Sequence, residues 1–189
     1  MKWFRNLGVF LLLLLAGSCG VSKSINNRPD LSNYTEFTPE RTKTSDSSYV
    51  IGDNFLTKNK QGLWEMYVEG NPLEIGLISG SLTRELMERQ EIAFFSQVEE
   101  FVPSRFKQNL LRKFLHWYNR KMYLHIPEEY KTEIYGLSKY ASTTYNKIAQ
   151  PYLRLLYVNG AHDIGHAMKD LMLVGCSSFA VWGDKTFDG

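Results

Sequence analysis

Residues 62–82 read GLWEMYVEGNPLEIGLISGSL and place a strand, a turn and the start of a helix in succession. Apolar and polar side chains alternate across residues 62–70, which predicts a strand. Asn71 and Pro72 then predict a turn. A helix continuing to about Phe101 is predicted from apolar residues at helical spacing, namely Ile75, Ile78, Leu82 and Leu86. The stretch therefore predicts an α+β fold.

Two further helices are predicted downstream. Ser104 is a suitable N-cap for the first, and Pro127 suits the first turn of the second. The apolar face of the first consists of Phe106, Leu110, Phe114 and Trp117, and that of the second of Tyr130, Ile134, Leu137 and Ala141.

A fourth helical stretch is predicted over residues 152–158. Asn159 and Gly160 are expected to end it, because this pair is typical of helix C-termini and turns. A short last helix is then expected over residues 161–173. Residues 61–175 together are therefore expected to form a mainly helical segment.

Two groups of side chains near the middle of the chain are expected to be structural. The aromatic group expected in the core is Phe114, Trp117, Tyr118 and Tyr123. The basic group expected on a solvated face is Arg112, Lys113, Arg120 and Lys121.

Upstream of the strand, residues 1–18 have the pattern of a secretory signal peptide. Lys2 and Arg5 precede an apolar run over residues 7–15, which is too short to span a bilayer, and Ala16, Gly17 and Ser18 are small. Cys19 follows directly, so the start resembles that of a bacterial lipoprotein in which the thiol of Cys19 is acylated. An ordinary secreted start is the alternative. The expected location is the cell envelope, with the chain attached to the membrane through lipid on Cys19.

Residues 19–60 are expected to form the lipidated cysteine and a flexible tether. They are rich in Ser, Asn, Thr, Asp and Lys, and no hydrophobic period holds across them. Tyr49, Val50 and Ile51 are the residues of this segment best suited to dock on the folded part.

The charge balance excludes one class of partner. Removal of residues 1–18 takes away two basic residues and no acidic one, so the formal charge falls from +2 to zero. We therefore expect no nucleic-acid partner, and nothing in this balance argues for an electrostatic membrane patch. The chain has two cysteines. If Cys19 is lipidated, Cys176 is unpaired and no disulfide can form.

The C-terminal residues predict a strand and part of a hairpin. Residues 176–182 (CSSFAVW) suit a strand, and Gly183, Asp184 and Lys185 a turn. Asp184 and Asp188 are expected to be turn residues rather than catalytic ones. A lone strand is marginal in water, so we expect residues 176–189 to be the start of a longer catalytic domain.

Cys176 has a structural and a catalytic interpretation. In the structural one it is a small buried hydrophobic residue. In the catalytic one its thiol attacks the carbonyl of Gly175, the peptide rearranges to a thioester, and hydrolysis frees Cys176 as a new N-terminus. Glycine suits the scissile position because it has no Cβ to obstruct the approach. The freed α-amine, with an unperturbed pKa of about 8, can serve as the general base of the thiol.

Residues 162–189, HDIGHAMKDLMLVGCSSFAVWGDKTFDG, resemble the junction region of the autoproteolytic acyltransferase and amidase family. This family includes acyl-coenzyme A:6-aminopenicillanic acid acyltransferase and is a branch of the N-terminal nucleophile hydrolases. Residues 62–82 are similar to the start of its pro-segment, where a strand, a turn and an E-x-G helix entry recur.

The resemblance implies that Cys176 is the nucleophile, that the bond from Gly175 to Cys176 is cleaved, and that no cofactor is needed. The substrate would be a small-molecule linear amide or acyl donor, and the catalytic domain an αββα sandwich. That domain follows the nucleophile in the family, and its oxyanion donors, each worth about 3 to 4 kcal/mol of barrier, lie there. We therefore expect this chain alone to be inactive, either as a fragment or as one part of an enzyme completed by a separate chain.

His162, Asp163 and His166 form an H-D-x-x-H motif on a predicted helix. Histidines at i and i+4 can hold zinc, with Asp163 where a metalloprotease helix carries its glutamate base. No third ligand is evident, since His116 and His125 are the only other histidines. The favoured interpretation is that these residues shape the surroundings of the nucleophile and that no metal binds. A non-catalytic lipid-anchored binding or scaffold protein is the main alternative function, and a metal-dependent hydrolase the second.

Overall fold

The computed structural model describes residues 20–35 and 37–167, and side chains within this part only as far as Gly160. The chain divides into two compact units, Met1–Leu156 and Tyr157–Gly189. The described part of the first unit contains an antiparallel sheet and most of the helices, and that of the second is the later half of helix α5 (Pro151–Ala167). The fold of the described residues is α+β, as the sequence predicted.

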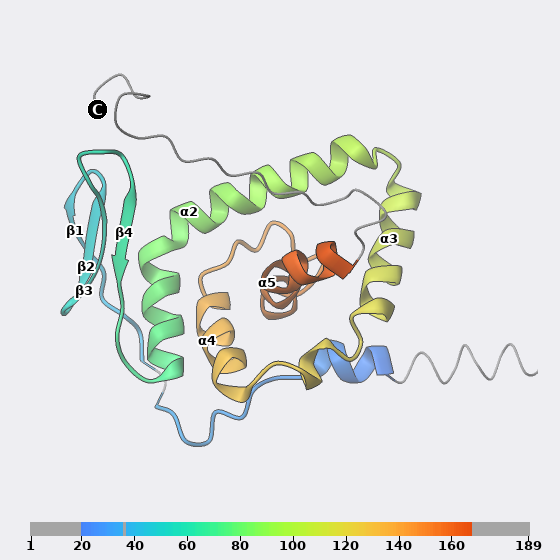
Figure 1. Ribbon diagram of the computed structural model, residues 1–189, viewed down its shortest axis with the longest axis horizontal. Coiled ribbons are helices and arrows are strands. Elements are labelled where there is room, and N and C mark those ends of the chain that lie inside the picture. The colour runs from blue at the N-terminus through green and yellow to red at the C-terminus, as the bar shows by residue number, and fades with distance from the viewer. Residues whose placement is uncertain (1–19, 36, 168–189) are drawn as a thin grey trace, which may run out of the picture. The chain divides into compact units, whose positions relative to one another are not determined.

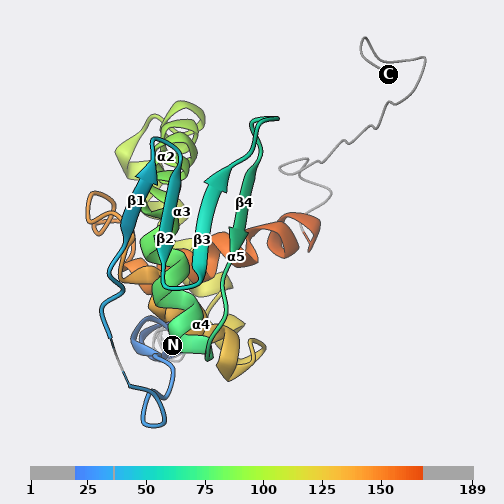
Figure 2. The ribbon, with the colours of Figure 1, turned by 90° about the vertical axis from the view of Figure 1, so that its left-hand side faces the viewer.

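The sheet is a meander of four short strands in the order β1-β2-β3-β4 (Figures 1 and 2). The strands are β1 (Thr42–Ser45), β2 (Ser48–Ile51), β3 (Asn54–Lys58) and β4 (Trp64–Tyr67). A two-residue turn at Gly52 and Asp53 joins β2 to β3, and Gly52 has a φ of 56°. This conformation suits glycine and gives the twist that a tight hairpin needs.

The prediction of a flexible tether over residues 19–60 is wrong for its second half, because β1, β2 and β3 lie there. Residues 20–26 are also helical. The sequence signal for these strands is weak because each has only four or five residues. Strand β1 is also fully exposed, so no apolar alternation marks it. Tyr49 and Ile51 do pack on the folded part, as the sequence suggested.

Helix α2 (Pro72–Phe101) organises the unit and begins where the sequence predicted. The Asn71 side chain accepts a hydrogen bond from the Glu74 backbone N–H at 3.1 Å, and Glu74 Oε2 accepts one from the Asn71 N–H at 2.8 Å. This reciprocal capping box satisfies two N–H groups that a helix start otherwise leaves unpaired. The predicted strand, turn and helix are therefore confirmed at β4, Asn71 and α2.

One side of α2 packs on the sheet, which lies along it in Figure 1. The core between them consists of Ile51, Leu56, Ile78 and Leu82, with Tyr49, Val68 and Leu86 packed around it. Arg41, just before β1, fastens the sheet to α2: its two Nη atoms each donate to a Glu85 carboxylate oxygen at 2.7 Å. The same guanidinium lies over the Tyr49 ring, 4.4 Å from its centroid.

Another side of α2 packs closely against α4 (Glu128–Ser138) through glycines. A Cβ added to Gly76 would lie 2.1 Å from the Glu133 carbonyl oxygen, and one on Gly136 would lie 2.8 Å from the Leu77 backbone nitrogen. The two backbones can approach this closely only because both positions lack a side chain. The E-x-G entry at Glu74 and Gly76 thus combines a helix cap with a helix contact.

The remaining helices follow the predicted positions with one exception. Helix α3 (Arg105–Tyr118) starts after Ser104, whose side chain makes no capping hydrogen bond, and α4 starts after Pro127; a short 3-10 helix, η1 (Met122–Leu124), lies between them. The prediction that Asn159 and Gly160 end a helix is wrong, because α5 runs through both. A glycine inside a helix costs only about 1 kcal/mol, which the helix tolerates here.

Candidate functional site

The residues that the sequence analysis placed at the chemical centre lie outside the described part. These are Gly175 and Cys176, the proposed cleavage pair, and Cys19, the proposed lipid-attachment residue. The predicted strand over 176–182 and the turn residues Asp184 and Asp188 lie there as well. Gly20, the neighbour of Cys19 in sequence, is described, and its Cα lies near the Arg120 side chain: an added Cβ would be 3.5 Å from Arg120 Cδ.

The H-D-x-x-H motif falls in the later half of α5. The structure gives His162, Asp163 and His166 a helical backbone, as predicted, but within α5 rather than in a separate short helix. The predicted residues 168–173 lie outside the described part. His162 and His166 are four residues apart in it, the separation that the motif requires. Their side chains are not among those described, so metal binding and a site-shaping role both stay predictions. Among the described side chains, no group of three or more His, Cys, Asp or Glu residues is arranged to hold a metal ion.

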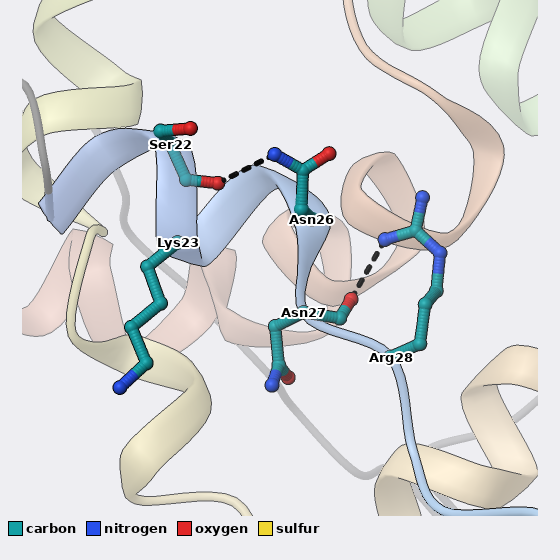
Figure 3. Close-up of a pocket in the computed structure, with 5 residues that line it drawn as sticks. All are labelled: Ser22, Lys23, Asn26, Asn27 and Arg28. Atoms are coloured by element: carbon teal, nitrogen blue, oxygen red, sulfur yellow. Dashed lines mark hydrogen bonds between the residues drawn. The ribbon is translucent and has the colours of Figure 1, made fainter.

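A polar depression lies along the first described segment, lined by Ser22, Lys23, Asn26, Asn27 and Arg28 (Figure 3). The Asn26 amide donates to the Ser22 carbonyl oxygen at 2.9 Å, and Arg28 Nη1 donates to the Asn27 carbonyl oxygen at 2.7 Å. Lys23 and Arg28 point away from each other in Figure 3. The two cations therefore do not form a paired cationic site for an anion.

Arg28 ties this segment to the start of α5. Its Nη2 donates to Gln150 Oε1 at 2.5 Å, and its guanidinium lies 5.2 Å from the centroid of the Tyr152 ring. Nearby, the backbone N–H of Asp30 donates to Glu128 Oε1 at 2.8 Å. Hydrogen bonding to Lys131, and then to this N–H, holds the pKa of Glu128 below its ordinary value. The segment is thus fastened to both α4 and α5.

Tyr152, in this region, has a buried hydroxyl without a hydrogen-bond partner among the described residues. It is 3% exposed, and its hydroxyl makes no hydrogen bond to any described residue; the same holds for the buried Oδ1 of Asn27. Burial raises the pKa of the Tyr152 hydroxyl to about 12, helped by Glu128 and opposed by Arg28. This hydroxyl is therefore a neutral donor at every physiological pH, unsuited to act as a general base.

A buried ion pair was missed by the sequence analysis. Arg154 Nε donates to Glu91 Oε1 at 2.6 Å, and the two side chains are only 3% and 7% exposed. The other Arg154 donors reach Asn146 Oδ1 and the carbonyl oxygens of Ser142 and Ala149. With its donors used in this way, Arg154 holds the 142–149 loop against α2 and serves structure rather than chemistry. No local sequence motif predicts this ion pair, because Glu91 and Arg154 are 63 residues apart in the chain.

The aromatic group expected in the core is divided. Tyr123 is buried, but Phe114, Trp117 and Tyr118 are exposed, so the prediction is wrong for these three. Helix α3, which carries them, contains no buried residue. Helical spacing shows that side chains share a face, but it does not show whether the fold covers that face.

Comparison with protein-family models, with curated proteins and with solved structures finds no match for this chain. Within residues 20–35 and 37–167, none of the helices combines the length and the apolar composition of a membrane-spanning segment.

Proposed function

We propose that this chain is the exported, lipid-anchored precursor of an N-terminal-cysteine amidohydrolase or acyltransferase. The observation that carries the proposal is the Gly175-Cys176 dipeptide within the sequence GCSSF, directly after the segment predicted to be mainly helical. In this proposal Cys176 is the nucleophile and Gly175 supplies the scissile carbonyl. Cys19 is the lipid-attachment site. His162, Asp163 and His166 shape the surroundings of the nucleophile.

Self-processing consumes one water molecule and needs no cofactor. The Cys176 thiol adds to the Gly175 carbonyl carbon, and the carbon-nitrogen bond breaks to leave a thioester with a free α-amine on Cys176. Water then cleaves the thioester, which gives the Gly175 carboxylate and restores the thiol. The freed amine accepts the thiol proton when the next amide or acyl donor is attacked.

The described fold supports a pro-segment role for the residues before the junction. A pro-segment needs a folded core before cleavage, and α2 packs on both the sheet and α4. The strand β4, the capped start of α2 and Gly76 also fit the family-like pattern at residues 62–82. A small-molecule linear amide or acyl donor is the proposed substrate.

The test is intact-mass spectrometry of the protein expressed from its native genetic locus, so that any partner chain is also supplied. Cleavage between Gly175 and Cys176 should occur in the wild type and be absent in Cys176→Ala. Cys176→Ser is the matched control: a hydroxyl at the same position should cleave, but more slowly. A wild-type chain that stays uncut would refute the self-processing role. The mass of an acylated Cys19, lost in Cys19→Ala, tests the lipid anchor independently.

A non-catalytic binding protein is the second candidate, and the exposure of β4 favours it. All four residues of this strand are exposed, including Trp64, Met66 and Tyr67, and β4 is at one edge of the described sheet (Figure 2). An apolar edge strand can accept a strand from a partner protein. This candidate predicts an uncut chain and a Cys176 thiol that resists alkylation in the folded protein.

A further inference from the structure

Helix α3 presents an apolar face outward. Phe106, Leu110, Phe114 and Trp117 are between 42% and 77% exposed, although all four are large and apolar. Their spacing of four, four and three residues places them along one side of the helix. A surface of this kind on a folded domain normally meets a partner or a membrane.

The orientation of α3 is fixed from its other side. Arg112 Nη1 donates to the Lys147 carbonyl oxygen at 2.5 Å. Burial lowers the pKa of His116, one turn further along, and the charge of Arg112 adds to this effect. Arg112 and His116 therefore face the protein, which leaves the apolar side facing outward.

The segment that carries this face has charged side chains of one sign. Residues 102–127 contain six lysines and arginines and no aspartate or glutamate, whereas the whole chain is nearly balanced at 22 basic and 20 acidic residues. Lys107 and Lys113 on α3 are exposed, and Arg120 and Lys121 follow the helix. Long basic side chains beside an apolar face can reach phosphate groups while the apolar groups stay buried in lipid.

The C-terminal end of α3 is arranged for an interfacial position. Arg120 Nη1 donates to the Trp117 carbonyl oxygen at 2.6 Å, and its guanidinium lies 4.6 Å from the centroid of the Trp117 ring. The Phe114 ring is 6.1 Å from that of Trp117 and 5.9 Å from that of Tyr118. Gly20 lies against the same Arg120 side chain, as noted above. A chain attached to the membrane at Cys19 would therefore carry α3 close to the bilayer surface.

We infer that α3 is a membrane-docking helix, which inserts Phe106, Leu110, Phe114 and Trp117 among the lipids of an anionic bilayer and pairs its flanking lysines with the headgroups. The absence of carboxylates from residues 102–127 favours anionic lipid over a protein surface of mixed charge. Docking is independent of cleavage at Cys176. It draws on the proposed lipid anchor only for proximity.

The test is quenching of Trp117 fluorescence by brominated lipids in vesicles of phosphatidylcholine, with and without phosphatidylglycerol. The chain has four tryptophans, so the signal of Trp117 is the difference between the wild type and Trp117→Phe. We expect quenching in the phosphatidylglycerol vesicles that weakens at high salt. At about 1 kcal/mol per basic residue, Lys107→Gln and Lys113→Gln should each lower the ratio of docked to undocked helix about fivefold.

Matched variants distinguish docking from anchoring. Phe106→Glu with Leu110→Glu should abolish the quenching, while Leu63→Glu, an equally exposed position before β4, should leave it unchanged. A chain that floats with vesicles while Trp117 stays unquenched would overturn docking and leave the lipid anchor intact. Equal quenching in both vesicle types would overturn the role of the lysines. A dimer in sedimentation that the Phe106→Glu, Leu110→Glu variant dissolves would instead assign the face to a second copy of this chain.

Discussion

Arg154 Nε and Glu91 Oε1 lie 2.6 Å apart in the interior of the first unit and join the start of α5 to the middle of α2. The Ser142 backbone N–H donates to the other Glu91 oxygen at 3.2 Å, and Arg154 Nη2 donates to the Ser142 carbonyl oxygen at 2.6 Å. The pair thus holds the loop around Ser142 on both sides. Both side chains are buried, so bulk solvent does not reach either charge.

Arg154→Ala should lower the free energy of unfolding by about 3 to 5 kcal/mol, because it leaves the Glu91 carboxylate buried without its counter-charge. Glu91→Leu combined with Arg154→Met should cost much less, since it removes both charges. Urea denaturation measures the stability of both variants. As a control, Arg89→Ala, at an exposed position of α2, should change the free energy of unfolding by less than about 0.5 kcal/mol. If the double variant is as unstable as Arg154→Ala, desolvation of the lone carboxylate is not the cause.

Gly76→Ala tests the contact between α2 and α4. Alanine is the better helix former by about 1 kcal/mol, so helix propensity alone predicts a more stable protein. The added Cβ would meet the Glu133 carbonyl oxygen at 2.1 Å, and this backbone atom cannot move aside cheaply. We expect a loss of about 2 to 3 kcal/mol by denaturant unfolding.

Two comparisons make the Gly76 result specific. Gly80→Ala should cost less, because Tyr140 Cδ2 at 2.7 Å belongs to a side chain that can rotate, and the nearest backbone atom, the Leu137 carbonyl oxygen, is at 3.0 Å rather than 2.1 Å. Gln90→Ala, at an exposed position of α2, should be neutral or slightly stabilising. Stabilisation by Gly76→Ala would show that the helices are further apart than described.

The ion pair of Arg41 and Glu85, which joins the sheet to α2, should stabilise the protein less at acidic pH. Hydrogen bonding to Arg41 lowers the Glu85 pKa from 4.5 to about 2. A lowered folded-state pKa means that the stabilisation is present above pH 4.5 and is lost as the pH falls toward 2. Because the Glu85 side chain is 46% exposed, solvent screening limits this contribution to about 1 kcal/mol.

Glu85→Gln should remove that part of the pH dependence. The measurement is the free energy of unfolding of wild type and variant across the acid range, with Glu88→Gln, an exposed carboxylate on the same helix, as control. The wild-type advantage over Glu85→Gln should shrink as the pH falls. A constant difference from pH 4.5 to 2 would mean that the ion pair is not what stabilises the sheet.

Local signals in the sequence predicted the local features of the fold. The strand within residues 62–70, the turn at Asn71 and Pro72 and the helix that follows depend on neighbouring residues, and the structure confirms them, although all four residues of β4 are exposed. The β2 to β3 hairpin also had a local signal, Gly52-Asp53 between two short apolar runs, which the polar composition of the segment obscured.

Features that depend on distant residues could not be predicted in this way. The buried pair of Glu91 and Arg154 and the exposure of Trp117 depend on how α2, α3 and α5 pack, which no window of a dozen residues contains. The proposed site has the opposite character. Gly175 and Cys176 are adjacent in the chain, so the proposed cleavage between them can be predicted from the sequence without knowledge of the packing. It stays a prediction until cleavage is measured.

Tyr152→Phe should leave stability unchanged or raise it by about 1 kcal/mol, because the buried hydroxyl has no hydrogen-bond partner among the described residues and its removal relieves a desolvation cost. The ring itself should stay, since it packs against Tyr135 at a centroid distance of 5.8 Å and lies under the Arg28 guanidinium. Thermal unfolding compares this variant with Tyr130→Phe, at an exposed position of α4. Clear destabilisation by Tyr152→Phe alone would mean that the hydroxyl is hydrogen-bonded in solution, to water or to a ligand, and would make the Asn27 and Tyr152 region a binding site worth probing.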